Sequence, residues 1–291
     1  DYTNPCGWVN AALRYIRLHV GSFEYYSRKY TESMPSDSRG PTVTLSTIPS
    51  RIGKIAPTLN SIFDQSMKPR RVFLAIPEFS LREKRRYRIP DVLLDSPVPR
   101  IIRSDRDWGP ATKLLALLRA GILERDELVV TIDDDNIYPQ NFLETIADHA
   151  RKLPTAALSL RGWHMPASFR WKDARDFKGT QIDQPEKTDV ITGCGGIAIR
   201  PYFFDESLFD YSRAPKEAFF VDDIWISGHL ARKGVPRYVI PSSGPYVYLG
   251  SLASLYGPAL DAIENGDGFN NDVVIDYFRD FWMGGPPAKK P

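Results

Sequence analysis

The sequence contains few of the residues that build disulfide-rich or zinc-binding proteins. It has two cysteines, Cys6 and Cys194, and four histidines among 291 residues. That is too few for a disulfide framework, and no cysteine–histidine spacing typical of a zinc site is present. The net charge is only +2, so no broad basic surface points to a nucleic-acid partner.

Long apolar runs are also missing. No stretch of about 18 apolar residues could cross a membrane as a helix, and no secretory signal peptide is recognisable. The sequence has no Asn-x-Ser/Thr site with a permitted middle residue, which favours a compartment without N-glycosylation. It begins at Asp1 rather than at a methionine. We interpret it as a trimmed or mature form, which leaves an upstream anchor or domain open.

What is present is typical of a globular α/β protein. Hydrophobic residues make up 42% of the chain and charged residues 25%, as in an ordinary large domain. From residue 42 onward, short β-branched runs alternate with helical patterns. This alternation predicts right-handed βαβ units and a Rossmann-like, mostly parallel central sheet flanked by helices. The expected strands lie within residues 42–51, 71–76, 99–103, 128–132, 156–160 and 237–240.

The two ends of the chain are expected to lie outside this sheet. Apolar and aromatic residues at helical spacing predict an N-terminal helix over 7–30, followed by a Ser/Gly/Pro linker. Packing on the domain is favoured for this helix, and peripheral contact with a membrane surface is the alternative. We divide the chain into 1–41, a single domain over 42–282, and a tail over 283–291 expected to be disordered. Within the domain, 81–88 is predicted to be a solvated helix and 272–282 a C-terminal helix.

The most informative stretch joins a buried strand to three carboxylates. Asp133, Asp134 and Asp135 directly follow the apolar run 128–132. Adjacent carboxylates repel each other and need a counter-charge if they are buried. Ligands of open α/β sheets lie beyond the carboxyl ends of strands, and Mg2+ or Mn2+ prefers oxygen ligands that are often shared with phosphates. We therefore predict a metal–diphosphate site here; a solvated acidic loop is the alternative.

Further motifs lie on the helices and loops around it. Lys113 falls in the first turn of a helix, where the dipole disfavours a cation, so an anionic ligand would explain its position. Residues 193–196 (Gly-Cys-Gly-Gly) allow close backbone approach to a ligand but match no phosphate-binding motif. Asp222 and Asp223 open another helix, either as caps or as a general base. The aperiodic, aromatic segment 161–188 is long enough to form a lid or a wall of a site.

In this order, the motifs resemble those of nucleotide-sugar-dependent glycosyltransferases of the glycosyltransferase-A fold, in a family-2-like or exostosin-like form with a DxD motif. The resemblance spans about residues 42–240. It rests on Thr-Leu-Ser-Thr-Ile-Pro-Ser-Arg (44–51), Asp-Trp-Gly-Pro-Ala-Thr-Lys-Leu (107–114), the three aspartates, residues 193–196 and Val-Asp-Asp-Ile-Trp-Ile-Ser (221–227). A DxD motif alone is common, whereas the ordered set is more specific.

The resemblance implies a role for each of these groups. Asp133 and Asp134 would face the ribose and the donor sugar, and Asp135, together with Asp133, would bind the metal that bridges the diphosphate. Asp223, with Asp222 beside it, matches the carboxylate that activates the acceptor hydroxyl. The other implied donor contacts are Ser46, Thr47, Ile48, Pro49 and Arg51 for the base and ribose, Asp107 and Lys113 for the nucleotide or its phosphates, and Gly195 and Gly196 for the sugars.

The implied activity is transfer of a sugar, with inversion, from a nucleoside-diphosphate sugar to a hydroxyl of a glycan or glycoconjugate, using Mn2+ or Mg2+. A UDP donor is favoured over a GDP donor, and cytoplasmic synthesis of surface glycans over a lumenal location. Residues 42–160 would bind the nucleotide and 161–282 the acceptor. Many such enzymes add a late histidine to the metal shell. Here the last histidine, His229, lies inside the helix after the acid pair, so Asn271, Asp272 or water would have to replace it.

Three other classes of protein remain compatible with the sequence. A haloacid-dehalogenase-like phosphatase would use Asp133 as its nucleophile, and 266–272 approaches its second metal motif, although 260–265 does not resemble the buried strand that should precede it. A nucleotidyltransferase of similar fold would need a glycine-rich basic signature that 42–51 lacks. A non-catalytic sugar-binding module would have no need for both acidic clusters.

Overall fold

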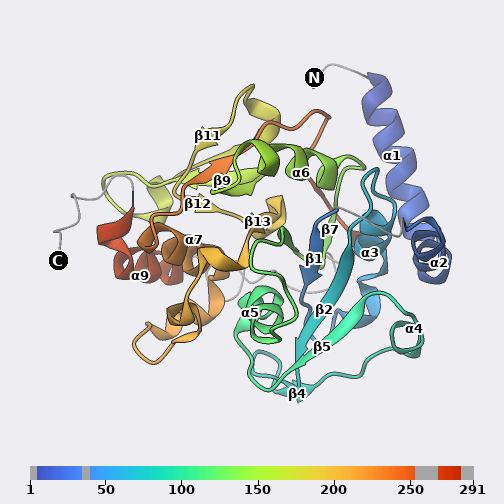
Figure 1. The fold of residues 1–291 in the computed structure, drawn as a ribbon, viewed down its shortest axis with the longest axis horizontal. Helices are drawn as coiled ribbons and strands as arrows, with labels where there is room; N and C mark the ends of the chain where they lie inside the picture. Colours follow the sequence, from blue (N-terminus) through green and yellow to red (C-terminus); the bar gives the residue numbers. More distant parts are fainter. Residues whose placement is uncertain (1–4, 35–39, 253–267, 283–291) are drawn as a thin grey trace.

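An eight-stranded sheet forms the centre of the protein in the computed structural model, which describes residues 5–34, 40–252 and 268–282 (Figure 1). Its strands are β1 (Thr42–Leu45), β2 (Arg71–Pro77), β5 (Arg100–Ser104), β6 (Val129–Ile132), β8 (Ala157–Ser159), β11 (Glu186–Lys187), β13 (Ile197–Ile199) and β14 (Arg237–Val239). The strand order is β11-β14-β8-β13-β6-β1-β2-β5.

Most pairings in this sheet are parallel. Strand β1 is parallel to β2 and β6, β2 to β5, and β8 to β14. Strand β13 is antiparallel to β6 and β8, and β11 is antiparallel to β14. The predicted α/β class with a mostly parallel central sheet is therefore confirmed.

Helices cover both faces of the sheet, as a mostly parallel sheet requires. They are α1 (Pro5–Val20), α2 (Phe23–Ser33), α3 (Ala56–Phe63), α4 (Asp91–Leu94), α5 (Thr112–Arg119), α6 (Phe142–Lys152), α7 (Asp222–Arg232) and α9 (Phe269–Tyr277). Alternate side chains of β2 show the division: Val72 and Leu74 join the core under α1, α2, α3 and α6, whereas Phe73 and Ala75 join the core under α5, α7 and α9.

Three small sheets lie outside the central one. Strands β9 (Arg161–His164), β10 (Arg175–Lys178) and β12 (Val190–Ile191) form a three-stranded sheet, and β7 (Asn136–Ile137) pairs with β15 (Leu249–Gly250). The segment expected to be a loop over 161–188 is thus partly β-structure.

The helix predicted for 81–88 is wrong. Strands β3 (Phe79–Ser80) and β4 (Arg85–Arg86) form a hairpin there. The segment has no apolar face that would stabilise a helix by packing. Tertiary hydrogen bonds hold the turn instead: the Leu81 N–H donates to Asp107 at 2.8 Å, and the Ser50 N–H donates to Glu83 at 3.0 Å.

The expected N-terminal helix is two helices. Gly21 and Ser22 separate α1 from α2, and the Ser22 hydroxyl accepts a hydrogen bond from the Tyr25 N–H as the N-cap of α2. The outer face of α1 exposes Val9, Leu13 and Ile16 by 57%, 62% and 57%. No helix within the described ranges is long and apolar enough to cross a membrane, and peripheral contact through this face stays a prediction.

The two expected halves of the domain share the central sheet. Strands β13 and β14, from the second half, lie beside β6 and β8 from the first. The helix expected over 272–282 is present as α9 and a following turn of 3-10 helix at Arg279–Phe281. The tail over 283–291 lies outside the described residues, and the assignment of nucleotide and acceptor to the halves stays a prediction.

Chain topology places a crevice at the ends of β1 and β6. From β1 the chain moves outward through β2 to β5 and then returns to β6 on the other side of β1. Such a reversal leaves room beyond the carboxyl ends of the two strands, where ligands of open α/β sheets bind. Ser46 directly follows β1 and Asp133 directly follows β6, so two predicted site segments meet at this point.

Arg14 anchors α1 to this edge of the sheet. Its buried guanidinium donates to Asp64 at 2.8 Å, to the Tyr138 carbonyl at 2.7 Å and to the Ser61 carbonyl at 3.2 Å. We expect Arg14→Met to lower the free energy of unfolding by about 3 kcal/mol, because it leaves the buried Asp64 carboxylate with only the longer contact to the exposed Arg17.

Urea unfolding measures this loss, with Arg17→Met as its control. Arg17 reaches the same carboxylate at 3.5 Å, but its side chain is 60% exposed. An exposed pair contributes little, so this variant should change the stability by less than about 0.5 kcal/mol. Equal effects of the two substitutions would contradict the anchoring role.

Candidate active site

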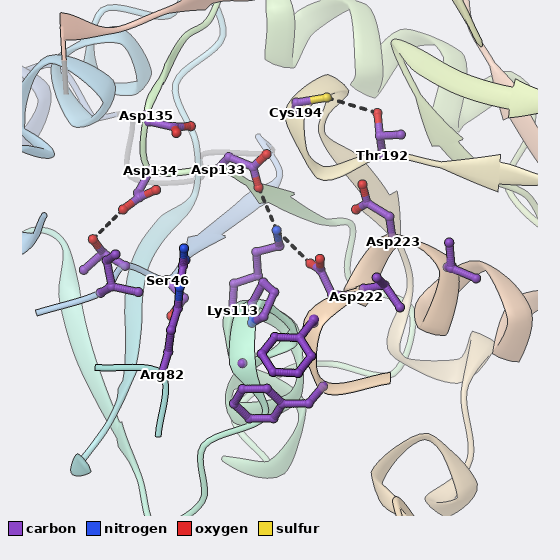
Figure 2. A pocket seen from close by; sticks show the side chains of 18 of the residues that line it. Ser46, Arg82, Lys113, Asp133, Asp134, Asp135, Thr192, Cys194, Asp222 and Asp223 are labelled. Carbon is purple, nitrogen blue, oxygen red and sulfur yellow. Dashed lines mark hydrogen bonds and ion pairs between the residues drawn. The ribbon is translucent and has the colours of Figure 1, made fainter. Parts of the chain in front are cut away.

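A cavity of about 1110 Å3 opens at the ends of β1 and β6 (Figure 2). Its wall comes from the loops after these strands, the first turns of α5 and α7, β9, and the start of α9. It therefore contains the predicted acids Asp133–Asp135 and the predicted pair Asp222 and Asp223 in one space.

The three aspartates after β6 do not face the same way. Asp133 and Asp135 are half-buried, whereas Asp134 is only 4% exposed. Asp134 accepts a hydrogen bond from the Thr47 hydroxyl and pairs with Arg51 at 3.1 Å. Asp134 is thus an anchor between the β1 and β6 loops, and Asp133 and Asp135 are the two carboxylates that remain open to the cavity.

Arg51 compensates part of the negative charge of this cluster. Its guanidinium lies 3.1 Å from an Asp134 oxygen and 2.8 Å from an Asp135 oxygen. Burial and the neighbouring carboxylates of Asp134 and Asp133 nevertheless raise the pKa of Asp135 to about 6. The strand end therefore still favours an additional positive charge beside Asp135.

Lys113 connects the strand end to the second acid pair. Its nitrogen donates to Asp133 at 2.7 Å and lies 2.9 Å from an oxygen of Asp222, an ion pair without hydrogen-bond geometry. Its side chain is only 5% exposed. These carboxylates raise the pKa of Lys113 well above its usual value despite its burial. The anion that explains this helix-terminal lysine is hence the protein's own pair of carboxylates (Figure 2).

Asp223 lies on the other side of this ion-pair network. One of its oxygens accepts the Gly193 N–H at 2.8 Å. A Cβ at position 193 would lie 2.7 Å from the Lys113 nitrogen and 2.8 Å from an Asp133 oxygen, so glycine is needed for this close packing. Burial and the Asp222 carboxylate raise the pKa of Asp223 well above its usual range, which strengthens it as a base.

Some predicted donor contacts face elsewhere. Asp107 lines the cavity, but its two oxygens accept the Leu81 and Gly109 N–H groups, both at 2.8 Å. Pro49, Gly195 and Gly196 are not among the residues that line the cavity. A Cβ on Gly195 would meet the Ser159 hydroxyl and the Arg161 backbone, and one on Gly196 the Phe142 ring, so both glycines pack into the protein. The predicted residues that do line it are Ser46, Thr47, Ile48, Arg51, Asp107, Lys113, Asp133, Asp134, Asp135, Asp222 and Asp223.

Part of the cavity wall was not identified from the sequence. Arg82 reaches the cavity from the β3–β4 hairpin, in the segment expected to be a solvated helix (Figure 2). The aromatic content of 161–188 indicated a wall, but not which of its residues face inward. The other newly found lining residues include Arg161, Trp163, Trp171, Lys172, Tyr248 and Gly268. Cys194, from the predicted 193–196 loop, and Asn271, a candidate metal ligand, also line the cavity.

The candidates for a third metal ligand have different positions. His229 does not line the cavity; it packs against Trp225 and Phe278 at ring-centroid distances of 4.5 Å and 5.2 Å. Asp272 accepts the Trp171 N–H at 2.6 Å, whereas Asn271 lines the cavity. No three histidine, cysteine or acidic side chains within the described ranges converge as a metal-binding group.

Comparison with known proteins adds little to this geometry. No family model and no curated protein matches the chain. Among solved structures, the crystal structure of GalNAc-T7 with UDP, GalNAc and Mn2+ is similar over 75% of this chain and 45% of that chain, at 13% identity and a TM-score of 0.48. The chain thus spans less than half the length of that protein.

The burial of His229 predicts an acid-sensitive fold. Burial, and secondarily the Arg232 charge, lower its pKa to about 3, whereas the unfolded chain binds this proton near pH 6.5. Stability should therefore fall as the pH decreases from about 6.5 toward 3. Urea unfolding at pH 7 and pH 4 gives the loss of unfolding free energy between these pH values. This loss should be about 3 kcal/mol smaller for His229→Gln than for wild type. Identical pH profiles would show that His229 is not buried as a neutral ring.

Proposed function

We propose that the protein is a metal-dependent glycosyltransferase that moves a sugar from a nucleoside-diphosphate sugar to an acceptor hydroxyl of a glycan or glycoconjugate. The supporting observation is the joining of two acid pairs, one at a strand end and one at a helix start, in one cavity through Lys113. The first pair suits a cation and a diphosphate, and the second suits a base. Residues 42–160 would bind the nucleotide and 161–282 the acceptor, and UDP is the favoured nucleotide.

The charge of the cavity supports the need for a metal. Among the described residues, five cationic side chains line it together with six carboxylates: Arg51, Arg82, Lys113, Arg161 and Lys172 against Asp107, Asp133, Asp134, Asp135, Asp222 and Asp223. These described residues offer an anionic diphosphate no surplus of positive charge. A divalent cation would supply that charge.

The residues present fit such a cation. Asp133 and Asp135 are the half-buried carboxylates of the strand end, and burial together with the Asp134 and Asp133 charges raises the pKa of Asp135. Mg2+ commonly uses one or two protein carboxylates and completes its shell with substrate phosphates and water. A cluster of three acidic or histidine ligands is thus unnecessary. The cation, when bound, would neutralise charge on the departing diphosphate.

The proposed chemistry assigns the remaining steps to side chains of this chain. Asp223 would accept the proton of the acceptor hydroxyl. The hydroxyl oxygen would at the same time bond to the anomeric carbon of the donor. The bond between that carbon and the diphosphate oxygen would break, and the configuration would invert. Asp222 and Lys113 would hold Asp223 and Asp133 at fixed positions relative to each other.

Asp135 is predicted to be essential for donor binding. Asp135→Asn should abolish the Mn2+-dependent part of UDP binding in titration calorimetry, because the amide is a much weaker ligand for a hard cation. The control is Asp148→Asn, since the Asp148 side chain is 45% exposed and its ion pair with Arg151 lies on the surface of α6. It should bind like wild type. Full Mn2+-dependent binding by Asp135→Asn would exclude the proposed metal ligand.

Asp223 is predicted to act after binding. Asp223→Asn should bind Mn2+ and UDP like wild type but transfer sugar about 100- to 10,000-fold more slowly, because the general base is missing. Release of UDP in the presence of acceptor measures the rate. Near-normal transfer would refute the assignment of the base.

A phosphatase assay separates this proposal from the haloacid-dehalogenase alternative. Wild type should not hydrolyse p-nitrophenyl phosphate in the presence of Mg2+. Turnover that disappears in Asp133→Asn would favour an aspartyl nucleophile and the phosphatase instead.

A further inference from the structure

The cavity has an aromatic wall that the proposed chemistry does not use. Trp163, on β9, and Trp171, in the 3-10 helix Trp171–Asp173, both line it and are both half-buried. Their ring centroids lie 4.4 Å apart with a tilt of 38°. We propose that this pair is a stacking platform for a pyranose ring of the acceptor, and that Asp272 positions it. The inference rests on the proposed function, since it names a subsite of the same cavity.

The backbone of Trp171 is fixed by α9. The Trp171 N–H donates to one oxygen of Asp272 at 2.6 Å, and Arg170 pairs with the other at 3.2 Å. Gly268, at a φ of +74°, precedes α9, and a Cβ there would lie 3.2 Å from the Trp171 ring. Asp272 and Gly268 thus hold this indole where it meets Trp163.

Arg161 packs over the ring of Trp163. The guanidinium lies 5.4 Å from the Trp163 ring centroid. It is itself fixed, because it donates to the Tyr248 hydroxyl at 2.7 Å and to Asp176 at 2.9 Å. A platform held from both sides loses little conformational entropy when a ligand binds.

The platform and the proposed base line the same cavity. Arg161 lies two residues before Trp163 on β9, and its carbonyl accepts the Thr192 N–H at 3.2 Å. The next N–H along the chain, that of Gly193, donates to Asp223 at 2.8 Å. A ring on the platform would therefore have its hydroxyls close to the group proposed to activate one of them.

The chemistry of the two indoles suits a sugar ring. Indole faces are apolar and attract the C–H groups of a pyranose face, and an indole N–H can donate to a hydroxyl. Neither indole nitrogen donates a hydrogen bond to another of the residues that the structure describes. The guanidinium beside Trp163 is already neutralised by Asp176, so the platform favours a neutral ring over a phosphate.

Saturation-transfer difference NMR with methyl β-glycopyranosides tests the platform without any donor. In wild type, saturation should reach mainly the protons of one ring face. Trp171→Ala should weaken this signal about ten-fold and Trp171→Phe much less, because the phenyl ring keeps an apolar face. The matched control is Trp8→Ala: Trp8 is 39% exposed and lies outside the cavity, so the signal should be unchanged.

The role of Asp272 is tested by comparing an alanine substitution with a conservative asparagine substitution. Asp272→Ala should weaken the signal about as much as Trp171→Ala, whereas Asp272→Asn keeps an oxygen that can accept the Trp171 N–H and should retain most of it. A general loss of folding would show as a lower urea midpoint in Asp272→Ala. In that case the Trp171→Phe and Trp171→Ala comparison decides.

Three results would overturn the platform: no saturation in wild type, equal saturation in Trp171→Ala, or displacement of the glycoside by uridine, which would make the platform a base site. Binding of Mn2+ and UDP is measured separately by calorimetry. In wild type, a missing glycoside signal with intact UDP binding refutes the platform alone, whereas absent UDP binding with an intact glycoside signal refutes the proposed donor.

Discussion

Compensation of buried carboxylates by two cations is the constraint on which this site depends. Arg51 pairs with Asp134 and Asp135, and Lys113 pairs with Asp133 and Asp222. Each cation joins elements that are far apart in the sequence. Unpaired carboxylates at this depth would be costly, and these two cations partner four of the acids of the site. The ion-pair network thereby sets the distance between the strand end and the helix start.

The network explains why neighbouring backbone positions are so restricted. A Cβ at position 193 would lie within 3 Å of the Lys113 nitrogen and an Asp133 oxygen, so a larger residue there would require this ion pair to shift. Thr47 and Arg51 engage the buried Asp134 carboxylate, whereas Asp133 and Asp135 stay half-buried. A cation could then meet two carboxylates and a diphosphate without displacing the whole cluster. Rigidity on this side of the cavity suits a group that must neutralise a leaving charge in place.

The other side of the cavity is built differently. Its wall is a three-stranded sheet, a short 3-10 helix and the start of α9, held together by Asp272 and Arg161 rather than by the central sheet. Aromatic faces replace buried charges there. A division between a charged, fixed side and an aromatic side is what transfer between an anionic donor and a neutral sugar acceptor would require.

The sequence by itself determined the parallel sheet, the acid-bearing strand end and the acids that open α7, because these depend on local patterns of apolar and charged residues. It did not predict the β3–β4 hairpin, whose turn is held by hydrogen bonds to Ser50 and Asp107. Only the tertiary structure decided that Lys113 pairs with the protein's own carboxylates and that Gly195 and Gly196 face inward. Such contacts join residues distant in the chain, and no local pattern records which side chains they bring together.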